Sequence, residues 1–572
     1  MDRQKSVSSK ESRSFFRPLV RYFQETPWSP VWTIALIALL LRLPNLNESL
    51  WFDELWSTRL VLKNLTLLSN TLIFDLHPPF YSLFMYVWVK FFGDAELAVR
   101  MPPLIFGISS IVLAYALAVK LTEKKTALLM SVLLCLSPVH IWYSQEARPY
   151  SATLFLLLLS ILSYHKLKDS PPHPVWYFVY VGSMTTAVLS HYYIGVYVIL
   201  ISAMCIFEWI RHLNAEVNRR LLILNSVSLA CLIAFVSLKR VFSGIVLGSS
   251  YLRALTPFQL WMLFFNWFLC GNSLWDINPY NNDVNVLLQK PLMGVVQMCF
   301  FVLFMHGTTL ILKEKKQTEN SSSAHLLLYL FSLPLFIMGL HLVGLENAYI
   351  ERSAFVALPF FYMILAKGAT AFESKPVTIS CIVLTIIFSI ISLTAYFWKS
   401  ERWTVYKPNP DWRAAAGYFG DELKGTAERS LAFGATPATE LTYYDVRIRE
   451  LLDATGADYR LKMLEGRVKR LLGGKNLLAK TISAGIEREV QFRNQERAHA
   501  RLLIHYPNID DTEAVYRALS RQNVKTFYLI HNRYWPGRFK KLLKIVMEDA
   551  RVQFQSNRSL KGIEIFKFRV VS

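Results

Sequence analysis

Apolar runs long enough to cross a lipid bilayer recur between Pro30 and about Trp398 of this chain and then stop. Each run covers roughly 20 residues, the length that a helix needs to span the hydrocarbon core of a membrane. Composition agrees, because 53% of the 572 residues are hydrophobic, only 18% are charged, and the mean hydropathy is +0.30. Such a balance is unusual for a soluble protein. The sequence therefore predicts a polytopic α-helical membrane protein with a different domain after the last run.

The apolar runs are predicted to make eleven crossings. A further apolar segment, Phe80 to Phe92, is left out because roughly 13 residues are too few to span, and we expect it to lie at the membrane interface or to re-enter the membrane. The basic stretch before the first run is typical of a secretory signal, but no small-residue cleavage site follows, so the run is predicted to be retained. The predicted spans are 29–43, 102–119, 126–143, 150–164, 175–190, 193–210, 221–238, 290–312, 325–344, 353–372 and 377–398.

Positive charge distinguishes the two faces of the predicted membrane domain. Lys and Arg concentrate in cytoplasmic loops, and with eleven crossings the basic loops fall on one side. We therefore expect a multi-pass protein of the inner (plasma) membrane with a periplasmic C-terminal domain. The same distribution accounts for the net charge of +21 without nucleic-acid binding. The expected parts are a cytoplasmic basic N-terminus at 1–28, a transmembrane domain at 29–400 with a first outer loop at 44–102, and an extracytoplasmic domain at 401–572.

The pattern after Asp411 changes to short β-rich runs that alternate with helical runs, which predicts a small α/β domain. All six cysteines precede this domain, at spacings typical neither of a zinc motif nor of a disulfide framework. No cofactor is predicted, and a divalent metal stays open because no ligand spacing argues for one. The expected strands are 430–433, 501–505, 526–530 and 562–568, and the expected helices are 411–423, 511–522 and 538–549.

The first outer loop carries the adjacent carboxylates Asp53 and Glu54 among aromatic residues. Partial burial raises the basicity of a carboxylate, which suits a general base. The alternative is an acidic pair that stabilises a helix N-terminus through the helix dipole. His77, before two prolines in the same loop, is a candidate phosphate contact or an ordinary hydrogen-bonded loop residue.

Two more outer clusters each place an arginine at a helix end, one at 143–150 with Arg148 and one at 346–352 with Arg352. Arginine presents a fixed fork of donors that matches phosphate, and ionisable groups at membrane depth are functional candidates. The alternatives are an ion pair between Arg148 and Glu146, and an Arg352 that extends to the interface.

Several of these segments, in this order along residues 30 to 400, resemble motifs of the GT-C superfamily of polyprenyl-phosphate-dependent glycosyltransferases. The resemblance is to the protein O-mannosyltransferase and lipid A aminoarabinose transferase group, bacterial glycosyltransferase family 39. One departure is that the late motif of the group often reads Arg-Tyr, whereas Ser353 follows Arg352. The matching segments are Leu50 to Glu54, His77 to Tyr81, Gly93 to Pro102, Ser137 to Tyr150, and Arg352 with Leu358-Pro359.

This resemblance implies an enzyme of cell-envelope glycosylation. It implies transfer of a sugar from a polyprenyl-phosphate donor to a protein, lipid or polysaccharide acceptor on the outer face, with inversion at the anomeric carbon. The implied catalytic residues are Asp53 and Glu54, with Asp53 as the base. The implied contacts to the donor phosphate are His77, Arg148 and Arg352, and those to the substrates are Tyr143, Glu146, Tyr150 and Glu351.

Three other functions stay open from the sequence. An oligosaccharide ligase or oligosaccharyltransferase shares the membrane and the lipid-linked donor but transfers a preassembled glycan. A transporter of lipid-linked sugars is expected to have paired halves with broken helices, which are not visible here. A non-catalytic membrane scaffold that presents the C-terminal domain would tolerate replacement of Asp53.

Overall fold

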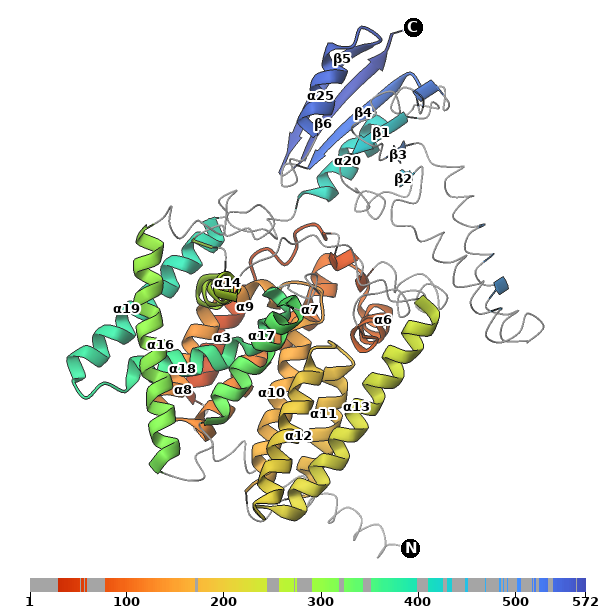
Figure 1. The fold of residues 1–572 in the computed structure, drawn as a ribbon. Coiled ribbons are helices and arrows are strands. Elements are labelled where there is room, and N and C mark those ends of the chain that lie inside the picture. Colours follow the sequence, from red (N-terminus) through yellow and green to blue (C-terminus); the bar gives the residue numbers. More distant parts are fainter. Residues whose placement is uncertain are drawn as a thin grey trace, which may run out of the picture.

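The computed structural model describes most of the membrane part and the central elements of the C-terminal part (Figure 1). The helices of the first part end at Trp398, and the elements of the second begin at Trp412. The described residues are 29–51, 53–55, 57–58, 78–169, 173–243, 257–271, 273–274, 291–317, 324–342, 351–398, 410–424, 430–434, 448–450, 502–505, 524–532, 539–561 and 563–571, with a few single residues between 469 and 520.

Every predicted crossing contains a helix. Within the described ranges, seven helices are long and apolar enough to cross a membrane, or eight if a bent pair counts as one span. Three other predicted crossings are shorter apolar helices, α3, α11 and α12. The prediction of a polytopic helical protein is therefore confirmed. The helices are α3 Ser29–Arg42, α6 Phe80–Phe92, α7 Glu96–Leu121, α8 Lys124–Leu136, α9 Pro138–Ser144, α10 Tyr150–Leu167, α11 Val175–Val188, α12 Ile194–Ile210, α13 Ala215–Ser243, α14 Pro257–Cys270, α16 Pro291–Gln317, α17 His325–Leu342, η4 Glu351–Ala357, α18 Leu358–Thr370 and α19 Lys375–Trp398.

Two helices lie across the direction of the bundle. In Figure 1, α6 and α14 are seen nearly end-on, whereas α10 to α13 run up and down the picture. For α6 this agrees with its omission from the predicted crossings. The prediction that 239–290 is a loop was wrong at α14: its 14 residues are too short to span, and packing against the core buries Phe264, Phe265 and Phe268.

Helix α7 begins at Glu96, six residues before the predicted start at Pro102. Proline has no backbone N–H, so Pro102 leaves the carbonyl of Ala98 without its helical donor. The indole Nε1 of Trp88 in α6 donates to that carbonyl at 2.9 Å. A side chain from the neighbouring helix thus allows α7 to extend past its proline pair and to carry Arg100.

The third predicted crossing is broken into α8 and α9, which meet at 62°. Pro138 begins α9, and the Ser137 hydroxyl caps it by accepting from the N–H of His140 at 3.3 Å. The guanidinium group of Arg42, which is fully buried, donates to the carbonyl of Cys135 at the end of α8 at 3.3 Å. The break directs the chain toward the loop 145–149.

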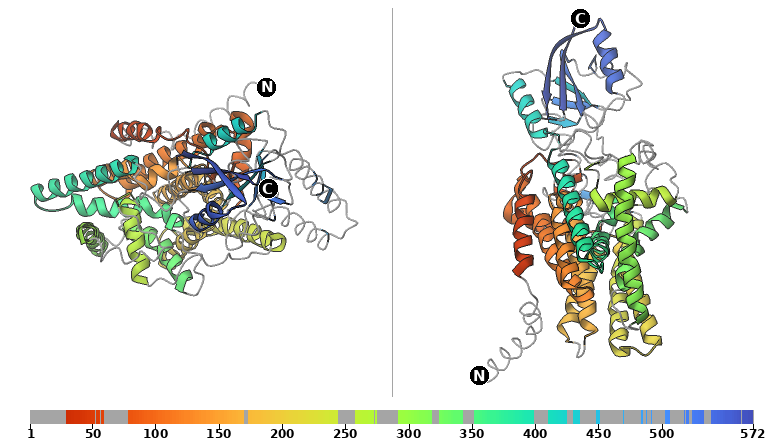
Figure 2. Two further views of the ribbon diagram at one scale, coloured as in Figure 1. Left: turned by 90° about the horizontal axis from the view of Figure 1, so that it is seen from above. Right: turned by 90° about the vertical axis from the view of Figure 1, so that its left-hand side faces the viewer.

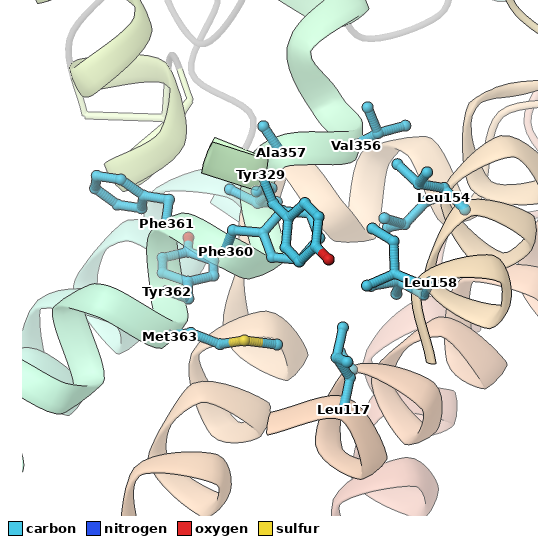
Figure 3. Close-up of a cluster of buried hydrophobic side chains, with 14 of the residues drawn as sticks. Leu117, Leu154, Leu158, Tyr329, Val356, Ala357, Phe360, Phe361, Tyr362 and Met363 are labelled. Carbon is cyan, nitrogen blue, oxygen red and sulfur yellow. The ribbon is translucent and has the colours of Figure 1, made fainter. Parts of the chain in front are cut away.

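Helix α18 is the centre of the membrane part, and its side chains are buried throughout. Figure 3 shows Phe360 and Met363 of α18 beside Leu117 of α7 and Tyr329 of α17. Glycines let α16 approach α18 closely, since a Cβ at Gly307 would lie 2.1 Å from the carbonyl oxygen of Ile364. Small residues at such crossings allow close backbone contact between membrane helices.

Polar contacts gather the loop ends of the bundle into two sets. At the ends predicted to be cytoplasmic, Lys120 pairs with Asp169 at 2.6 Å and Lys168 with Glu208 at 2.5 Å. The loop ends that are predicted to lie outside contain the contacts of the candidate site, which are described below. Positions assigned to opposite faces by charge are thus separate in space.

The C-terminal part contains a six-stranded mixed sheet, in the order β2-β3-β1-β4-β6-β5, among the described residues. The prediction of an α/β domain is confirmed. Helix α20 (Trp412–Glu422) packs on one face with Trp412 and Phe419, and α25 (Phe539–Glu548) packs on the other with Phe539 and Leu542. The strands are β1 Ser430–Gly434, β2 Ile448–Glu450, β3 Leu502–His505, β4 Thr526–Asn532, β5 Val552–Leu560 and β6 Ile563–Val570.

Four of these strands match predicted ones, with shifts of at most two residues at their ends. β1, β3 and β4 are parallel, so that Ala432 of β1 lies opposite Ile504 and Tyr528. Strand β5 was missed because it is a largely exposed edge strand with polar residues on both faces, and therefore lacks the alternation that identifies a half-buried strand. Most of the helix expected at 511–522 lies outside the described residues.

Candidate active site

The chain after α3 folds around the guanidinium group of Arg100, which is 1% exposed. Arg100 Nη1 donates to the carbonyls of Leu46 at 2.9 Å and Glu48 at 2.6 Å, and Nη2 donates to that of Ser49 at 3.2 Å. A buried guanidinium group is stable only where its donors find acceptors. One side chain of α7 thus fixes the path of residues 46–49.

Glu54 completes this arrangement. Its two carboxylate oxygens accept from Arg100 Nε at 2.8 Å and Nη2 at 2.6 Å, the bidentate geometry of strong arginine pairs. Its Oε1 also accepts from the N–H of Ala147 at 3.0 Å, and the residue is 1% exposed. Glu54 therefore ties the first outer loop to the loop between α9 and α10.

Asp53 faces a different neighbour. Its Oδ2 lies 2.7 Å from Nη1 of Arg352, and the two side chains are 20% and 19% exposed. Nη1 of Arg148 donates to the Asp53 carbonyl at 3.2 Å and to the Ser57 hydroxyl at 2.9 Å. Residues 53–55 are helical, and successive side chains on a helix are about 100° apart, which is why the adjacent carboxylates diverge. Three predicted residues from three separate loops meet here.

Two predicted tyrosines line one side of this group. The rings of Tyr143 and Tyr150 meet edge to face with centroids 4.8 Å apart, and the guanidinium carbon of Arg352 lies 6.0 Å from the Tyr150 ring centre. His191 lies 6.1 Å from the same ring, centroid to centroid. Aromatic faces next to a cation stabilise it and form an apolar wall.

Glu146 is a buried acid beside the group, at 4% exposure. Among the described residues, neither of its carboxylate oxygens has a hydrogen-bond partner. Burial raises its pKa from 4.5 to about 8, and the carboxylates of Asp53 and Glu54 add to this rise while the arginines oppose it. Glu146 is therefore mostly protonated at neutral pH, and can donate a hydrogen bond.

This raised pKa predicts a pH dependence of stability. Between pH 4.5 and about 8 the folded chain holds a proton at Glu146 that the unfolded chain has lost, so the free energy of unfolding falls as pH rises. Glu146→Gln removes this titration. We expect its melting temperature to gain on that of the wild type between pH 5 and pH 8. The corresponding gain in the free energy of unfolding is at most a few kcal/mol, since a pKa shift of one unit corresponds to about 1.4 kcal/mol. Parallel curves of melting temperature against pH for the two proteins would show that the Glu146 carboxyl has no raised pKa.

Two predicted site residues cannot be located in this group. His77 lies outside the described residues, and Glu351 begins η4 but its side chain is not described. Sequence analysis assigned no role to Ser57 and kept Arg100 only as a reserve contact for the donor phosphate, whereas in the structure Arg100 is paired with Glu54. Within the described part of the chain, no group of three or more His, Cys, Asp or Glu residues is arranged to hold a metal ion.

Residues 76–238 match the family model of the dolichyl-phosphate-mannose-protein mannosyltransferases. This stretch includes Arg100, Glu146, Arg148 and both tyrosines. The predicted resemblance to the protein O-mannosyltransferase group is confirmed over this stretch of the chain. No curated protein matches the chain in sequence.

Solved structures show weak likeness in fold. ArnT from Cupriavidus metallidurans bound to undecaprenyl phosphate is 11% identical with a TM-score of 0.48, covering 95% of this chain and 98% of that one. The Archaeoglobus fulgidus oligosaccharyltransferase in complex with Zn and sulfate is 15% identical with a TM-score of 0.42, covering 88% and 68%. The archaeal oligosaccharyltransferase AglB from Archaeoglobus fulgidus, with an inhibitory peptide and a dolichol-phosphate, is 12% identical with a TM-score of 0.43, covering 94% and 74%.

Proposed function

Because this multi-pass membrane protein is related to the protein O-mannosyltransferases, we propose that it transfers a sugar from a polyprenyl-phosphate donor to a hydroxyl acceptor on the outer face of the membrane, inverting the anomeric carbon. The observation that supports this most is the contact between Asp53 and Arg352 beside Arg148. A carboxylate and two guanidinium groups meet at loop ends, where a lipid phosphate and a water-soluble acceptor both have access.

The reaction needs one proton acceptor and one site for developing negative charge. Asp53 takes the proton of the acceptor hydroxyl as its oxygen bonds to the anomeric carbon, and the bond from that carbon to the phosphate oxygen breaks. Arg352 and Arg148 stabilise the departing polyprenyl phosphate. Arg352 is paired with Asp53 at 2.7 Å, so in this proposal donor binding exchanges a carboxylate for a phosphate at Arg352 and frees the base.

The remaining predicted residues have supporting roles in this proposal. We assign Glu54 a positioning role instead of the predicted catalytic one, because Arg100 and the Ala147 N–H already occupy its oxygens. Glu146 and Tyr150 contact the sugar or the acceptor. Tyr143, Glu351 and His77 keep their predicted roles as substrate and phosphate contacts.

Orientation and membrane are part of the same proposal. The basic loops face the cytoplasm, and the site and the C-terminal domain face outside the inner membrane. The separation of the polar contacts into two sets supports alternating crossings, with Lys120 and Lys168 in one set and Asp53 in the other. The excess of Lys and Arg on one side supports the direction.

Purified full-length protein, supplied with radiolabelled polyprenyl-phosphate monosaccharides, tests the proposed function. We expect transfer to a hydroxyl acceptor by the wild type. Arg148→Ala and Arg352→Ala should each weaken donor binding and turnover by about tenfold or more, because each loses a charge-assisted hydrogen bond that is typically about 1.5–3 kcal/mol. Lys424→Ala, a surface cation of the C-terminal part, is the control.

Two of the three other functions would give a different outcome in this assay. Use of preassembled glycans only would indicate an oligosaccharide ligase. Movement of the donor across vesicles without cleavage would indicate a transporter. Normal donor binding by both arginine variants would place the leaving-group site elsewhere. Mass spectrometry of envelope glycans with and without the protein identifies the acceptor.

A further inference from the structure

The C-terminal domain contacts the loop that leads into the candidate site. Arg413 in α20 donates through Nε to Glu96 at 2.9 Å and through Nη2 to the carbonyl of Asn47 at 3.0 Å. Lys561, in the turn between β5 and β6, pairs with Glu48 at 2.9 Å. Figure 2 shows the sheet at one end of the helical part, with α20 beside the sheet. Two cations of the domain therefore meet two carboxylates of the membrane part.

A serine of the loop also completes the start of α20. The first N–H groups of a helix have no partner within it. The Asp411 side chain accepts from the N–H of Ala414 at 3.0 Å, and the hydroxyl of Ser49 accepts from the N–H of Arg413 at 3.2 Å. The same hydroxyl donates to Asp411 Oδ1 at 3.2 Å. The helix is thus capped jointly by its own aspartate and by the loop of the membrane part.

The contacted segment 47–49 belongs to the stretch that Arg100 organises. Arg100 of the membrane part binds the carbonyls of Glu48 and Ser49. Arg413 and Lys561 of the C-terminal domain bind the same segment. Arg100 also holds Glu54, the neighbour of Asp53. The path from the sheet to Asp53 is therefore a series of direct contacts.

The domain side of this contact is rigidly joined to the sheet. Trp412, next to Arg413, is 1% exposed in the core under the sheet. The N–H of Asp411 donates to the carbonyl of Lys561 at 2.9 Å, so the two contact points of the domain are also joined to each other. A shift of the domain would therefore also move the residues that contact the loop, Asp411, Arg413 and Lys561.

We propose that the C-terminal domain is a positioning element of the active site, in which Arg413, Asp411 and Lys561 hold residues 47–49 and thereby set the placement of Asp53. This proposal rests on the proposed function for its effect on turnover. The contact itself is independent of any substrate. Arg413 is a positioning residue, since it touches the loop and not the reacting atoms.

A charge swap in the full-length protein tests this role. Arg413→Glu should reduce turnover about 5- to 10-fold with donor affinity unchanged, because it sets two carboxylates against each other at Glu96. The double variant Arg413→Glu, Glu96→Arg should recover to within about twofold of the wild type. Lys424→Glu makes a comparable charge change at the other end of α20, in an exposed pair with Asp421, and should have no effect. Loss of turnover without recovery in the double variant would overturn the proposal.

Hydrogen exchange of the loop amides separates this proposal from the proposed function. Exchange at residues 48–55, which include the N–H of Glu48 bonded to Asn45, should be about tenfold faster in Arg413→Glu and normal in the double variant. Unchanged exchange in Arg413→Glu would overturn the positioning role even in an active enzyme. If the wild type transfers no sugar, the proposed function fails, and the exchange rates still decide whether the domain orders the loop.

Discussion

Replacement of Asp53 by Asn should reduce turnover by about a hundredfold or more, the usual contribution of a general base. The amide keeps the size of the side chain but cannot take the proton of the acceptor hydroxyl. Because Arg352 then loses the carboxylate that it pairs with at 2.7 Å, donor affinity should stay the same or increase. Single-turnover transfer and equilibrium binding of a polyprenyl-phosphate sugar measure the two effects separately.

The matched control is Asp94→Asn, an exposed aspartate of the same predicted loop, which should leave both quantities unchanged. Near-normal turnover of Asp53→Asn with a hydroxyl acceptor would remove Asp53 as the base. A loop-capping role for its carboxylate would then be the better interpretation.

Replacement of Arg100 by Ala should destabilise the protein by about 3–5 kcal/mol, the usual cost of removing one partner from a buried ion pair. Glu54 would remain at 1% exposure without its cation, and three or more loop carbonyls would lose a donor. We expect a much lower melting temperature and a low yield of monodisperse protein in detergent. Thermal unfolding followed by size-exclusion chromatography measures both.

Arg352→Ala is an informative comparison, because it breaks an ion pair whose side chains are 19% and 20% exposed. Its effect on stability should be within about 1 kcal/mol, the range of exposed pairs, while donor use is impaired. Adding Glu54→Ala to Arg100→Ala should recover part of the lost stability, since no uncompensated charge remains. Equal melting temperatures for Arg100→Ala and Arg352→Ala would contradict the distinction between a structural and a functional pair.

Sequence patterns predicted the helical membrane part because the bilayer imposes length and hydropathy on each crossing. The same rule excluded Phe80 to Phe92, which is a 13-residue helix that lies across the bundle. The rule also placed no crossing at α14, but it could not reveal this short apolar helix, which is buried by packing against other helices. In the C-terminal part, strands with one buried face were predictable, whereas the exposed edge strand β5 was not.

Helix boundaries depended on contacts that no local pattern contains. Pro102 and Pro103 predict a helix start, but the Trp88 indole donates to the carbonyl that Pro102 leaves open, and α7 begins at Glu96. Pro138 breaks a predicted crossing into α8 and α9, and Arg42 stabilises the break. In both cases a side chain from another helix satisfies a backbone group.

For the candidate site, the sequence by itself determined which residues are candidates for chemistry and in which predicted outer loops they lie. Adjacent carboxylates, two arginines and two tyrosines could be read from composition, motif order and charge. Only the tertiary structure decided their partners: Asp53 meets Arg352, Glu54 is enclosed by Arg100, and Glu146 is buried without a partner in the described part of the chain. The reason is physical. One step along a helical turn rotates a side chain by about 100°, so adjacent residues face different elements, and the residues of those elements are far away in sequence.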